Sequence, residues 1–196
     1  MRIIFIHPNF PAQFRHLAYA LGKNPGNQVL FVTSNPRPEW EIPGVKKIIY
    51  KSHKKQTVAS SNLQINNLIN EGQAVLDTLL QLKRQGFKPD LIYAHSGWGT
   101  TFFIKDLFPR TPFLGYFEWY YNPQGKDMTF GNSKVTVSQA TTLRLKNLPI
   151  LNDLLSCQAG TTPTRWQFMQ FPELFHHKLH IIHDGIDTNF FKPGNK

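Results

Sequence analysis

The sequence predicts an α/β fold, with a doubly wound, mostly parallel sheet and helices on both of its faces. Short apolar runs, each suited to one buried strand, alternate along the chain with segments of helical periodicity. The helical segments reach ten residues or more, the length of crossovers in βαβ units. A chain of 196 residues suits one such domain. Its single cysteine excludes an intramolecular disulfide framework and a cysteine-rich zinc module.

The individual elements follow from local patterns. Apolar runs predict strands at residues 2–7, 28–33, 47–50, 91–94, 113–117 and 179–183. Apolar residues at three- and four-residue spacing predict helices at residues 12–23, 61–85, 100–107 and 137–155. The expected buried face of the first helix carries Phe14, Leu17, Ala18 and Leu21. A further short helix is expected to begin at Pro163 with Thr162 as its N-cap, while residues 118–136 are polar and irregular.

The chain is strongly basic, with a formal net charge of +10, which favours anionic partners. A basic run comprises Lys46, Lys47, Lys51, Lys54 and Lys55. It is either a solvated loop or a surface for peripheral contact with an anionic membrane. Nucleic acid is not an expected partner, because neither an arginine-rich segment nor zinc-finger spacing occurs. No apolar run suits a signal peptide or a membrane span, so the expected location is cytoplasmic, with any membrane contact at the inner face of the plasma membrane.

Polar and aromatic residues follow the predicted strands, at the edge where doubly wound domains bind ligands. His95, at one strand end, either binds or deprotonates a sugar hydroxyl, or is a structural hydrogen-bonding group. Gly97 and Gly99 either expose backbone N–H groups to a phosphate or carboxylate, or only permit a tight turn. Glu118 stands among Trp119, Tyr120 and Tyr121. A carboxylate among rings suits carbohydrate; the alternative is an aromatic cluster at the domain edge.

The sequence lacks the motifs of several other kinds of binding or catalytic site. Residues 7–11 replace the glycines of a dinucleotide fingerprint, and no Walker phosphate loop occurs, so no nicotinamide, flavin or ATP is expected. Ser96 is not in a hydrolase elbow. Four histidines at 176, 177, 180 and 183 lack acidic or cysteine ligands that would complete a metal site, and no metal is expected. Cys157 is expected to be a small core residue.

Five segments together carry a resemblance to a known family. They are residues 7–17 (HPNFPAQFRHL), 95–99 (HSGWG), 113–121 (FLGYFEWYY), 162–167 (TPTRWQ) and 181–188 (IIHDGIDT). They span nearly the whole chain in the family's order. The chain resembles the N-terminal domain of a GT-B fold glycosyltransferase of the family 4 type common in bacteria and cyanobacteria.

This resemblance implies the acceptor-binding half of a retaining glycosyltransferase, whose active site lies between two Rossmann-like domains. Residues 1–190 would form the N-terminal domain, and residues 191–196 would begin the linker to a donor domain. The substrates would be a nucleotide sugar and a glycan or glycolipid acceptor, as in polysaccharide synthesis, with neither a cofactor nor a required metal. Because the donor domain would bind most of the nucleotide sugar, the 196-residue chain alone is expected to be inactive.

The resemblance also implies roles for particular residues. The catalytic pair would be His95 and Glu118. The acceptor-binding residues would be His7, Asn9, Phe10, Gln13, Phe14, Ser96, Gly97, Trp98, Gly99, Trp119, Tyr120 and Tyr121. The residues facing the interdomain cleft would be Arg165, His183, Asp184 and Gly185.

The sequence departs from the family pattern at two places. Many relatives have a glycine-rich loop where residues 7–11 stand here, and many have a histidine at or beside the position of Glu118. Two alternatives to a transferase remain open. One is a free-standing, non-catalytic module that binds carbohydrate or a partner, and the other is a GT-B fold epimerase acting on a sugar nucleotide.

Overall fold

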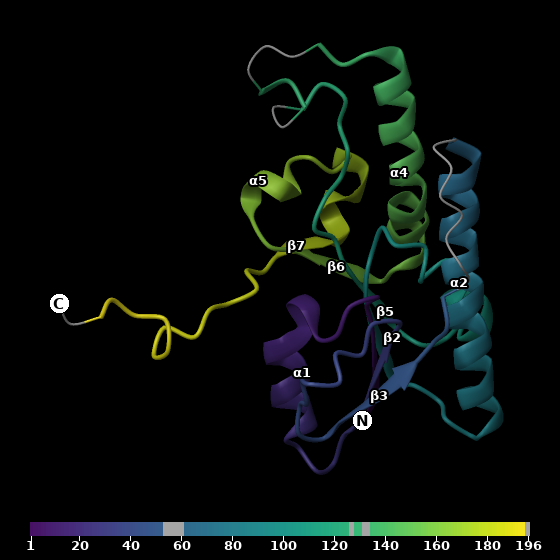
Figure 1. Ribbon diagram of the computed structural model, residues 1–196, viewed down its shortest axis with the longest axis vertical. Helices are drawn as coiled ribbons and strands as arrows, with labels where there is room; N and C mark the ends of the chain where they lie inside the picture. The colour runs from purple at the N-terminus through teal and green to yellow at the C-terminus, as the bar shows by residue number, and fades with distance from the viewer. Residues whose placement is uncertain (53–60, 126–127, 131–133, 195–196) are drawn as a thin grey trace.

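The computed structural model describes residues 1–52, 61–125, 128–130 and 134–194. Its centre is a seven-stranded sheet in which every strand pairing is parallel (Figure 1). The strands are β1 (Arg2–Ile6), β2 (Gln28–Thr33), β3 (Val45–Ile49), β4 (Leu91–His95), β5 (Phe113–Tyr116), β6 (Ala159–Thr162) and β7 (Leu179–Ile181). Their order in the sheet is β3-β2-β1-β4-β5-β6-β7. The doubly wound α/β fold is therefore confirmed.

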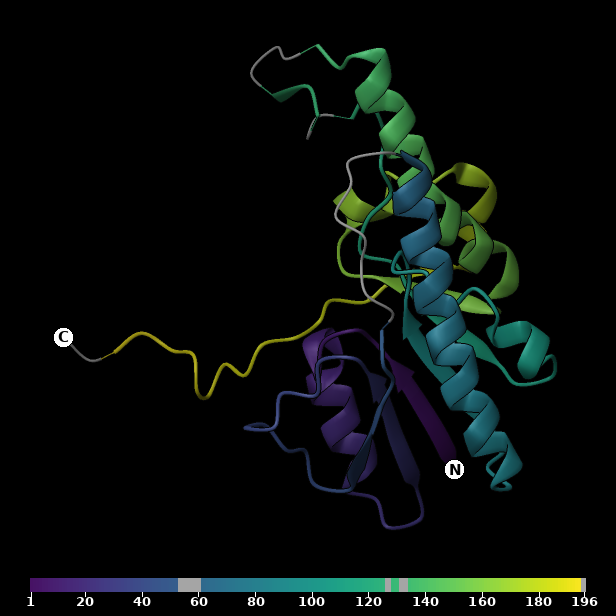
Figure 2. The ribbon, with the colours of Figure 1, turned by 45° about the vertical axis from the view of Figure 1, so that its right-hand side comes forward.

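Helices cover both faces of this sheet. They are α1 (Arg15–Gly22), α2 (Ser61–Arg84), α3 (Ile104–Leu107), α4 (Val137–Ser156) and α5 (Arg165–Phe168), with 3₁₀ turns η1 (Ala12–Phe14) and η3 (Glu173–Lys178). The helices α2 and α4 lie side by side on one face, and α1 lies on the other (Figure 2). The alternation of side chains along β1 explains both layers: Ile4 and Ile6 pack with α2 and α4, whereas Ile3 and Phe5 pack with α1.

The strand that the sequence did not reveal is β6. Its residues, Ala159–Thr162, contain no large apolar side chain, so no apolar run marks them. Their small size is required by Phe117, whose ring lies over Gly115 and Gly160. A Cβ at either glycine would approach this ring to within 2.5 Å. The missing apolar signal is therefore a consequence of one large ring packing across two neighbouring strands.

Several predicted boundaries are wrong. Thr162 ends β6, and the N-cap of α5 is Thr164, whose hydroxyl accepts a hydrogen bond from the backbone N–H of Gln167. The predicted helix at 12–23 begins as a 3₁₀ turn, and Leu17 is exposed on α1. Residues 100–103 are turns preceding the short α3, and β7 ends at Ile181. The strand predicted at 47–50 begins two residues earlier and ends one residue earlier, as β3.

The strand order places a topological switch point between β1 and β4. From β1 the chain winds outward to β2 and β3, and then returns to build β4 through β7 on the other side. Crossover connections therefore leave β1 and β4 in opposite directions, and a crevice opens beyond the carboxyl ends of these two strands. This is the edge to which His7 and His95 belong.

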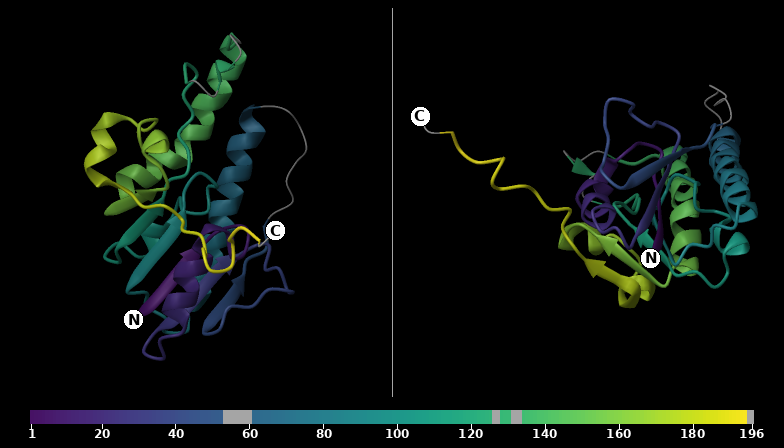
Figure 3. Two further views of the ribbon diagram at one scale, coloured as in Figure 1. Left: turned by 90° about the vertical axis from the view of Figure 1, so that its left-hand side faces the viewer. Right: turned by 90° about the horizontal axis from the view of Figure 1, so that it is seen from below.

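After β7, the described chain runs away from the domain. Residues 182–194 are exposed, and the segment extends outward from the sheet edge (Figure 3). Two hydrogen bonds fix its beginning: the backbone N–H of Ile182 donates to the Thr162 carbonyl at 2.9 Å, and the Tyr116 hydroxyl donates to the Asp184 carboxylate at 2.8 Å. Among the described residues, no helix is long and apolar enough to cross a membrane.

A pair of glycine variants tests how closely the loop after β4 packs on α2. Gly99 has φ of +78°, and a Cβ there would lie 2.3 Å from the Leu68 carbonyl oxygen. Gly86 has φ of +86° with no atom within 4 Å of its Cβ position. Both alanine variants carry backbone strain of about 1 kcal/mol, but Gly99→Ala adds overpacking, so it should lose on the order of 2 kcal/mol more unfolding free energy than Gly86→Ala. Urea denaturation measures this difference; equal losses would contradict the close packing.

Candidate functional site

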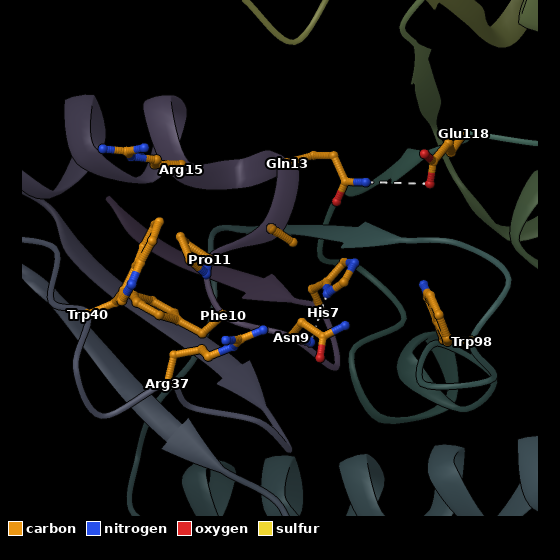
Figure 4. A pocket seen from close by; sticks show the side chains of 11 residues that line it. His7, Asn9, Phe10, Pro11, Gln13, Arg15, Arg37, Trp40, Trp98 and Glu118 are labelled. Atoms are coloured by element: carbon orange, nitrogen blue, oxygen red, sulfur yellow. Dashed lines mark hydrogen bonds between the residues drawn. The ribbon is translucent and has the colours of Figure 1, made fainter.

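An open cavity of about 650 Å³ lies beyond the carboxyl end of β1. Its walls come from the β1–α1 connection, the loop after β2, the loop after β4 and the residue that follows Phe117. The lining residues are His7, Asn9, Phe10, Pro11, Ala12, Gln13, Arg15, Arg37, Trp40, Trp98 and Glu118. Figure 4 shows Glu118 and Trp98 at one end, Arg15 and Trp40 at the other, and Gln13, His7 and Asn9 between them, with the Arg37 side chain running from the Trp40 end toward Asn9. Six of the predicted site residues thus meet in one cavity.

His7 directly follows β1 and is held as a neutral ring. Its Nδ1 accepts the backbone N–H of Asn9 at 2.8 Å, so the proton of the neutral ring is on Nε2. Burial and the neighbouring His95, whose ring centroid is 4.8 Å away, lower the pKa of His7 to about 3. The site therefore offers an N–H donor at neutral pH, without a positive charge.

His95 ends β4 and is buried behind the cavity wall. Its Nε2 lies 3.1 Å from Oε2 of Glu118, and its Nδ1 lies 2.8 Å from the Ser96 carbonyl oxygen. Both partners are acceptors, so these two contacts together require a proton on each nitrogen. The indole N–H of Trp98 also approaches Nδ1, at 3.1 Å, and this contact requires the unprotonated nitrogen. Nδ1 therefore donates to the Ser96 carbonyl oxygen when it carries a proton, and accepts from the Trp98 indole N–H when it does not.

Glu118 presents its carboxylate to the cavity from the chain just past β5. The hydrogen bond from His95 is the main cause that lowers the pKa of Glu118, although partial burial opposes it. Gln13 Nε2 also donates to Oε2, at 3.4 Å (Figure 4). The backbone is anchored on both sides, because Phe117 N donates to the Thr161 carbonyl and Gln167 Nε2 donates to the Glu118 carbonyl. A carboxylate with about four acceptor positions keeps room for a ligand hydroxyl.

The loop after β4 is held from beneath by Asp153 of α4. Ser96 Oγ and Thr101 Oγ1 both donate to Asp153 Oδ2, at 2.6 and 2.8 Å. Asp153 is completely buried, and this burial raises the pKa of its carboxyl group to about 7. Ser96 is therefore not part of the cavity wall: its hydroxyl fixes the loop that carries Trp98. The sequence did not single out Asp153, which lies in the middle of a helical pattern.

A second cavity, of about 550 Å³, shares Asn9 and Trp98 with the first. Gly97 and Tyr121 line it, so two predicted acceptor residues belong to this neighbouring space. At its wall, the buried Glu71 of α2 accepts hydrogen bonds from the hydroxyls of Tyr50 and Ser52. Its other lining residues are Pro8, Ser34, Gln64, Asn67, Leu68 and Lys146.

The remaining predicted acceptor residues lie away from both cavities. Phe14 is in the hydrophobic core under His7, with its ring 4.7 Å from that of Tyr93. Gly99 packs against α2. Trp119 lies beside Trp166, with ring centroids 4.9 Å apart, and Tyr120 packs on Phe171. Of the aromatic residues that line the first cavity, Phe10 and Trp98 were predicted and Trp40 was not; Trp40 and Trp98 are exposed, whereas Phe10 is buried.

The residues predicted for an interdomain cleft lie along the same edge. Arg165 is exposed at the start of α5. Asp184 accepts a hydrogen bond from the Tyr116 hydroxyl; burial, and then this bond, raise the pKa of Tyr116. His183 Nδ1 accepts the backbone N–H of Gly185, which has a positive φ.

The basic run divides into residues with different roles. Lys46 and Lys51 are exposed, and Lys54 and Lys55 lie outside the described residues. Lys47 is turned inward, where its ammonium group donates to backbone carbonyls of the loop after β2. That loop carries Arg37 and Trp40. These two residues and Arg15 line the cavity, but the sequence did not single them out as site residues. The rule that ligands bind at the carboxyl ends of strands could have found Arg37 and Trp40, since both follow β2.

Among the residues that the structure describes, no group of three or more His, Cys, Asp or Glu side chains could hold a metal ion. His176 hydrogen-bonds to the Phe171 carbonyl, and His7 and His95 make the hydrogen bonds described above. Cys157 is buried at the end of α4, as expected for a core residue.

A family model described as the glycosyl transferase family 4 group matches residues 25–191. The chain belongs to this family. No curated protein matches it by sequence. The match includes β2 through β7 and therefore Trp98, His95 and Glu118, whereas β1 and His7 precede it.

Solved structures share the fold at low sequence identity. Sucrose-phosphate synthase from Thermosynechococcus elongatus is 13% identical, with a TM-score of 0.54 over 94% of this chain and 90% of that chain. The calicheamicin glycosyltransferase CalG4 is 13% identical, with a TM-score of 0.55 over 99% of this chain and 55% of that chain. UGT2 of Phytolacca americana is 11% identical, with a TM-score of 0.55 over 83% and 48%. The fold is that of an N-terminal GT-B domain, and this chain spans about half the length of the latter two proteins.

The neutral His7 makes stability depend on pH in a defined direction. Its pKa is about 3 in the folded chain and about 6.5 when unfolded, so the unfolded chain binds more protons between these values. The free energy of unfolding should therefore fall as the pH drops below 6.5, by about 2 kcal/mol at pH 5 from this residue alone. His7→Asn keeps an acceptor for the Asn9 N–H without a titrating ring.

Urea unfolding at pH 8 and pH 5 measures this contribution. The wild-type chain should lose about 2 kcal/mol more than the His7→Asn variant between the two pH values. The same loss in both proteins would mean that His7 titrates normally in the folded chain.

Proposed function

We propose that this domain binds the acceptor in a retaining glycosyltransferase, which transfers a sugar from a nucleotide-sugar donor to a glycan or glycolipid. The observation that carries the proposal is Glu118, whose carboxylate lines an open cavity with aromatic residues. A hydrogen bond from His95 orients this carboxylate and lowers its pKa. Family membership supports glycosyl transfer as the reaction class. Retention of configuration is what the resemblance to this family implies.

The cavity contains the groups that carbohydrate recognition needs. Sugar rings offer apolar faces, which pack on aromatic side chains such as Trp98 and Trp40, and hydroxyl groups, which both donate and accept hydrogen bonds. Glu118 supplies acceptors and His7 Nε2 supplies a donor. A volume of about 650 Å³ is within the range of small-ligand sites.

His95 and Glu118 have different roles in this proposal. Glu118 lines the cavity and contacts an acceptor hydroxyl, whereas His95 is buried and acts through Glu118 as a positioning residue. An ionised Glu118 accepts the hydroxyl proton in a hydrogen bond and orients the hydroxyl oxygen toward the donor sugar. Orientation of this kind lowers the entropic part of the barrier.

The donor would be bound mainly by a second domain. Residues 1–190 then form the acceptor domain, and residues 191–196 lead into the donor domain. UGT2, which shares the fold, was crystallised with UDP-2-fluoroglucose and pterostilbene, and a nucleotide sugar is also the donor that we propose here. Arg165, His183, Asp184 and Gly185 would face the cleft between the domains. Stabilisation of the leaving diphosphate falls to the donor domain, so the 196-residue chain alone should have no transferase activity.

The proposed cellular setting is the cytoplasm, where the two exposed lysines of the basic run, Lys46 and Lys51, could meet anionic lipid at the inner face of the plasma membrane. Such contact suits a glycolipid acceptor.

A charge-removing variant of the native gene product tests the role of Glu118. Glu118→Gln has nearly the same shape but no negative charge, so kcat/KM for transfer should fall by about 100-fold. The assay measures transfer of radiolabelled sugars from a panel of nucleotide sugars to a lipid and glycan extract of the source cells. The anomeric configuration of the product, read by NMR, should match that of the donor.

Glu173→Gln is the matched control, because Glu173 is exposed on η3, away from the cavity. It should transfer as well as the wild type. Unchanged transfer by Glu118→Gln would refute the proposed role of Glu118, and a product of inverted configuration would refute retention. Release of a free epimer without transfer would identify an epimerase instead, and glycan binding by the native product without any turnover would identify a binding module.

A further inference from the structure

The end of the first cavity opposite Glu118 is cationic. Arg15, at the start of α1, and Arg37, in the loop after β2, both line it, with Trp40 beside them (Figure 4). The Arg15 guanidinium lies over the Trp40 ring, 5.2 Å from its centroid. Glu118 is the one acidic residue that lines this cavity among the described residues, and it stands at the other end.

The loop that carries Arg37 and Trp40 is held in place by Lys47 of β3. Lys47 Nζ donates to the carbonyl oxygens of Pro36 at 3.0 Å, Arg37 at 3.1 Å and Trp40. An ammonium group has three N–H donors, so the loop engages all of them. The same ammonium also lies 4.6 Å from the centroid of the Phe10 ring. Lys47 therefore fastens the loop to the sheet and to the cavity wall.

Arg37 has a backbone conformation that needs such support. Its φ of +46° is in the left-handed region, which costs a residue with a side chain about 1 kcal/mol or more. Strained backbone at a residue that lines a cavity is typical of binding sites. The Lys47 bonds to the carbonyls on either side of the Arg37 Cα help to hold this conformation.

Neither arginine has a strong partner of opposite charge. Within the described part of the chain, Arg15 has no carboxylate at ion-pair distance. Arg37 approaches Glu39 at 3.7 Å, but both side chains are about half exposed, and exposed pairs of this kind are weak. Glu41 lines a different cavity on the other side of the loop. Two guanidinium groups are therefore available to a ligand in the first cavity.

We propose that Arg15 and Arg37 form an oxyanion subsite, which binds a phosphate or carboxylate group on the acceptor sugar. Guanidinium groups present paired N–H donors that match the oxygens of both anions. The sugar ring then lies between this subsite and Glu118, against the exposed ring of Trp40. The acceptor class is thus an anionic sugar, either a sugar phosphate or a uronic acid; assigning the ligand as the acceptor rests on the function proposed above.

The test is a binding titration of the 196-residue chain, followed by ¹H–¹⁵N NMR at low ionic strength. The probes are glucose 6-phosphate, glucuronate, uncharged glucose, inorganic phosphate and UDP. The chain has four tryptophans, so the indole N–H signals identify which rings the ligand meets. At least one anionic sugar should bind about tenfold more tightly than glucose and shift the Trp40 signal, while those of Trp119 and Trp166 stay fixed. Comparison of glucose 6-phosphate with glucuronate distinguishes phosphate from carboxylate.

Charge-matched variants locate the subsite. Arg15→Gln and Arg37→Gln should each remove most of the preference for the anionic sugar and leave glucose binding unchanged. Arg110→Gln is the control, because it removes the same charge from an exposed arginine before β5, at the opposite edge of the sheet, and it should change nothing. Because Arg15 and Arg37 are exposed, their variants should fold, which circular dichroism checks.

Four results would overturn this inference. The first two are that no sugar binds, and that glucose and both anionic sugars bind with equal affinity. The third is that Arg110→Gln loses as much affinity for the anionic sugar as Arg15→Gln and Arg37→Gln do. The fourth is that Arg15→Gln and Arg37→Gln weaken the binding of UDP instead of the binding of the anionic sugars. The last result would assign the arginines to the donor diphosphate. If the inference fails while Glu118→Gln still lowers transfer as expected in the native gene product, the proposed function stands. If the anionic sugar binds at the arginines while Glu118→Gln transfers normally, the subsite stands without the proposed role of Glu118.

Discussion

The arrangement of the candidate site depends on one hydrogen bond, between His95 Nε2 and Glu118 Oε2. It joins the carboxyl ends of two neighbouring strands, β4 and β5, and it gives the exposed carboxylate a fixed partner in the protein interior. The surrounding contacts serve this pair. The hydrogen bonds that Ser96 and Thr101 donate to Asp153 fix the loop beside His95. The Phe117 ring, which packs over Gly115 and Gly160, fixes the backbone before Glu118. His7 completes the group as a neutral neighbour, because its burial and its closeness to His95 lower its pKa.

Much of the fold could be predicted from the sequence, because its periodicities are strong. The parallel sheet, the long helix α2 and the gathering of His7, His95 and Glu118 at one edge all follow from apolar runs and from the geometry of parallel strands. The strand β6 could not be predicted in this way. Its residues are small because a ring from elsewhere in the chain packs over them, and periodicity carries no information about such a distant contact.

Within the site, the sequence indicated which strand ends matter but not where each side chain points. Trp119 and Tyr120 follow Glu118 and were expected to face the sugar, yet they pack on Trp166 and Phe171. The exposed tryptophans that line the cavity are Trp98, which was predicted, and Trp40, which was not. Lys47 belongs to a run of lysines typical of a solvated surface, yet it holds a loop by three backbone carbonyls. Asp153 lies in an ordinary helical pattern and becomes recognisable only when Ser96 and Thr101 are seen to reach it.

The central claim is that the His95 hydrogen bond lowers the pKa of Glu118 and holds its carboxylate in place to accept a hydrogen bond from a hydroxyl group. The most direct measurement is a ¹³C NMR titration of the Glu118 carboxyl carbon in the wild-type chain and in His95→Leu. The wild type should show a pKa below the ordinary value for glutamate, because the hydrogen bond from His95 favours the charged form. In His95→Leu the pKa should rise to the ordinary value or above it, since partial burial then acts alone. An ordinary pKa in the wild type, or no change on loss of His95, would contradict the account.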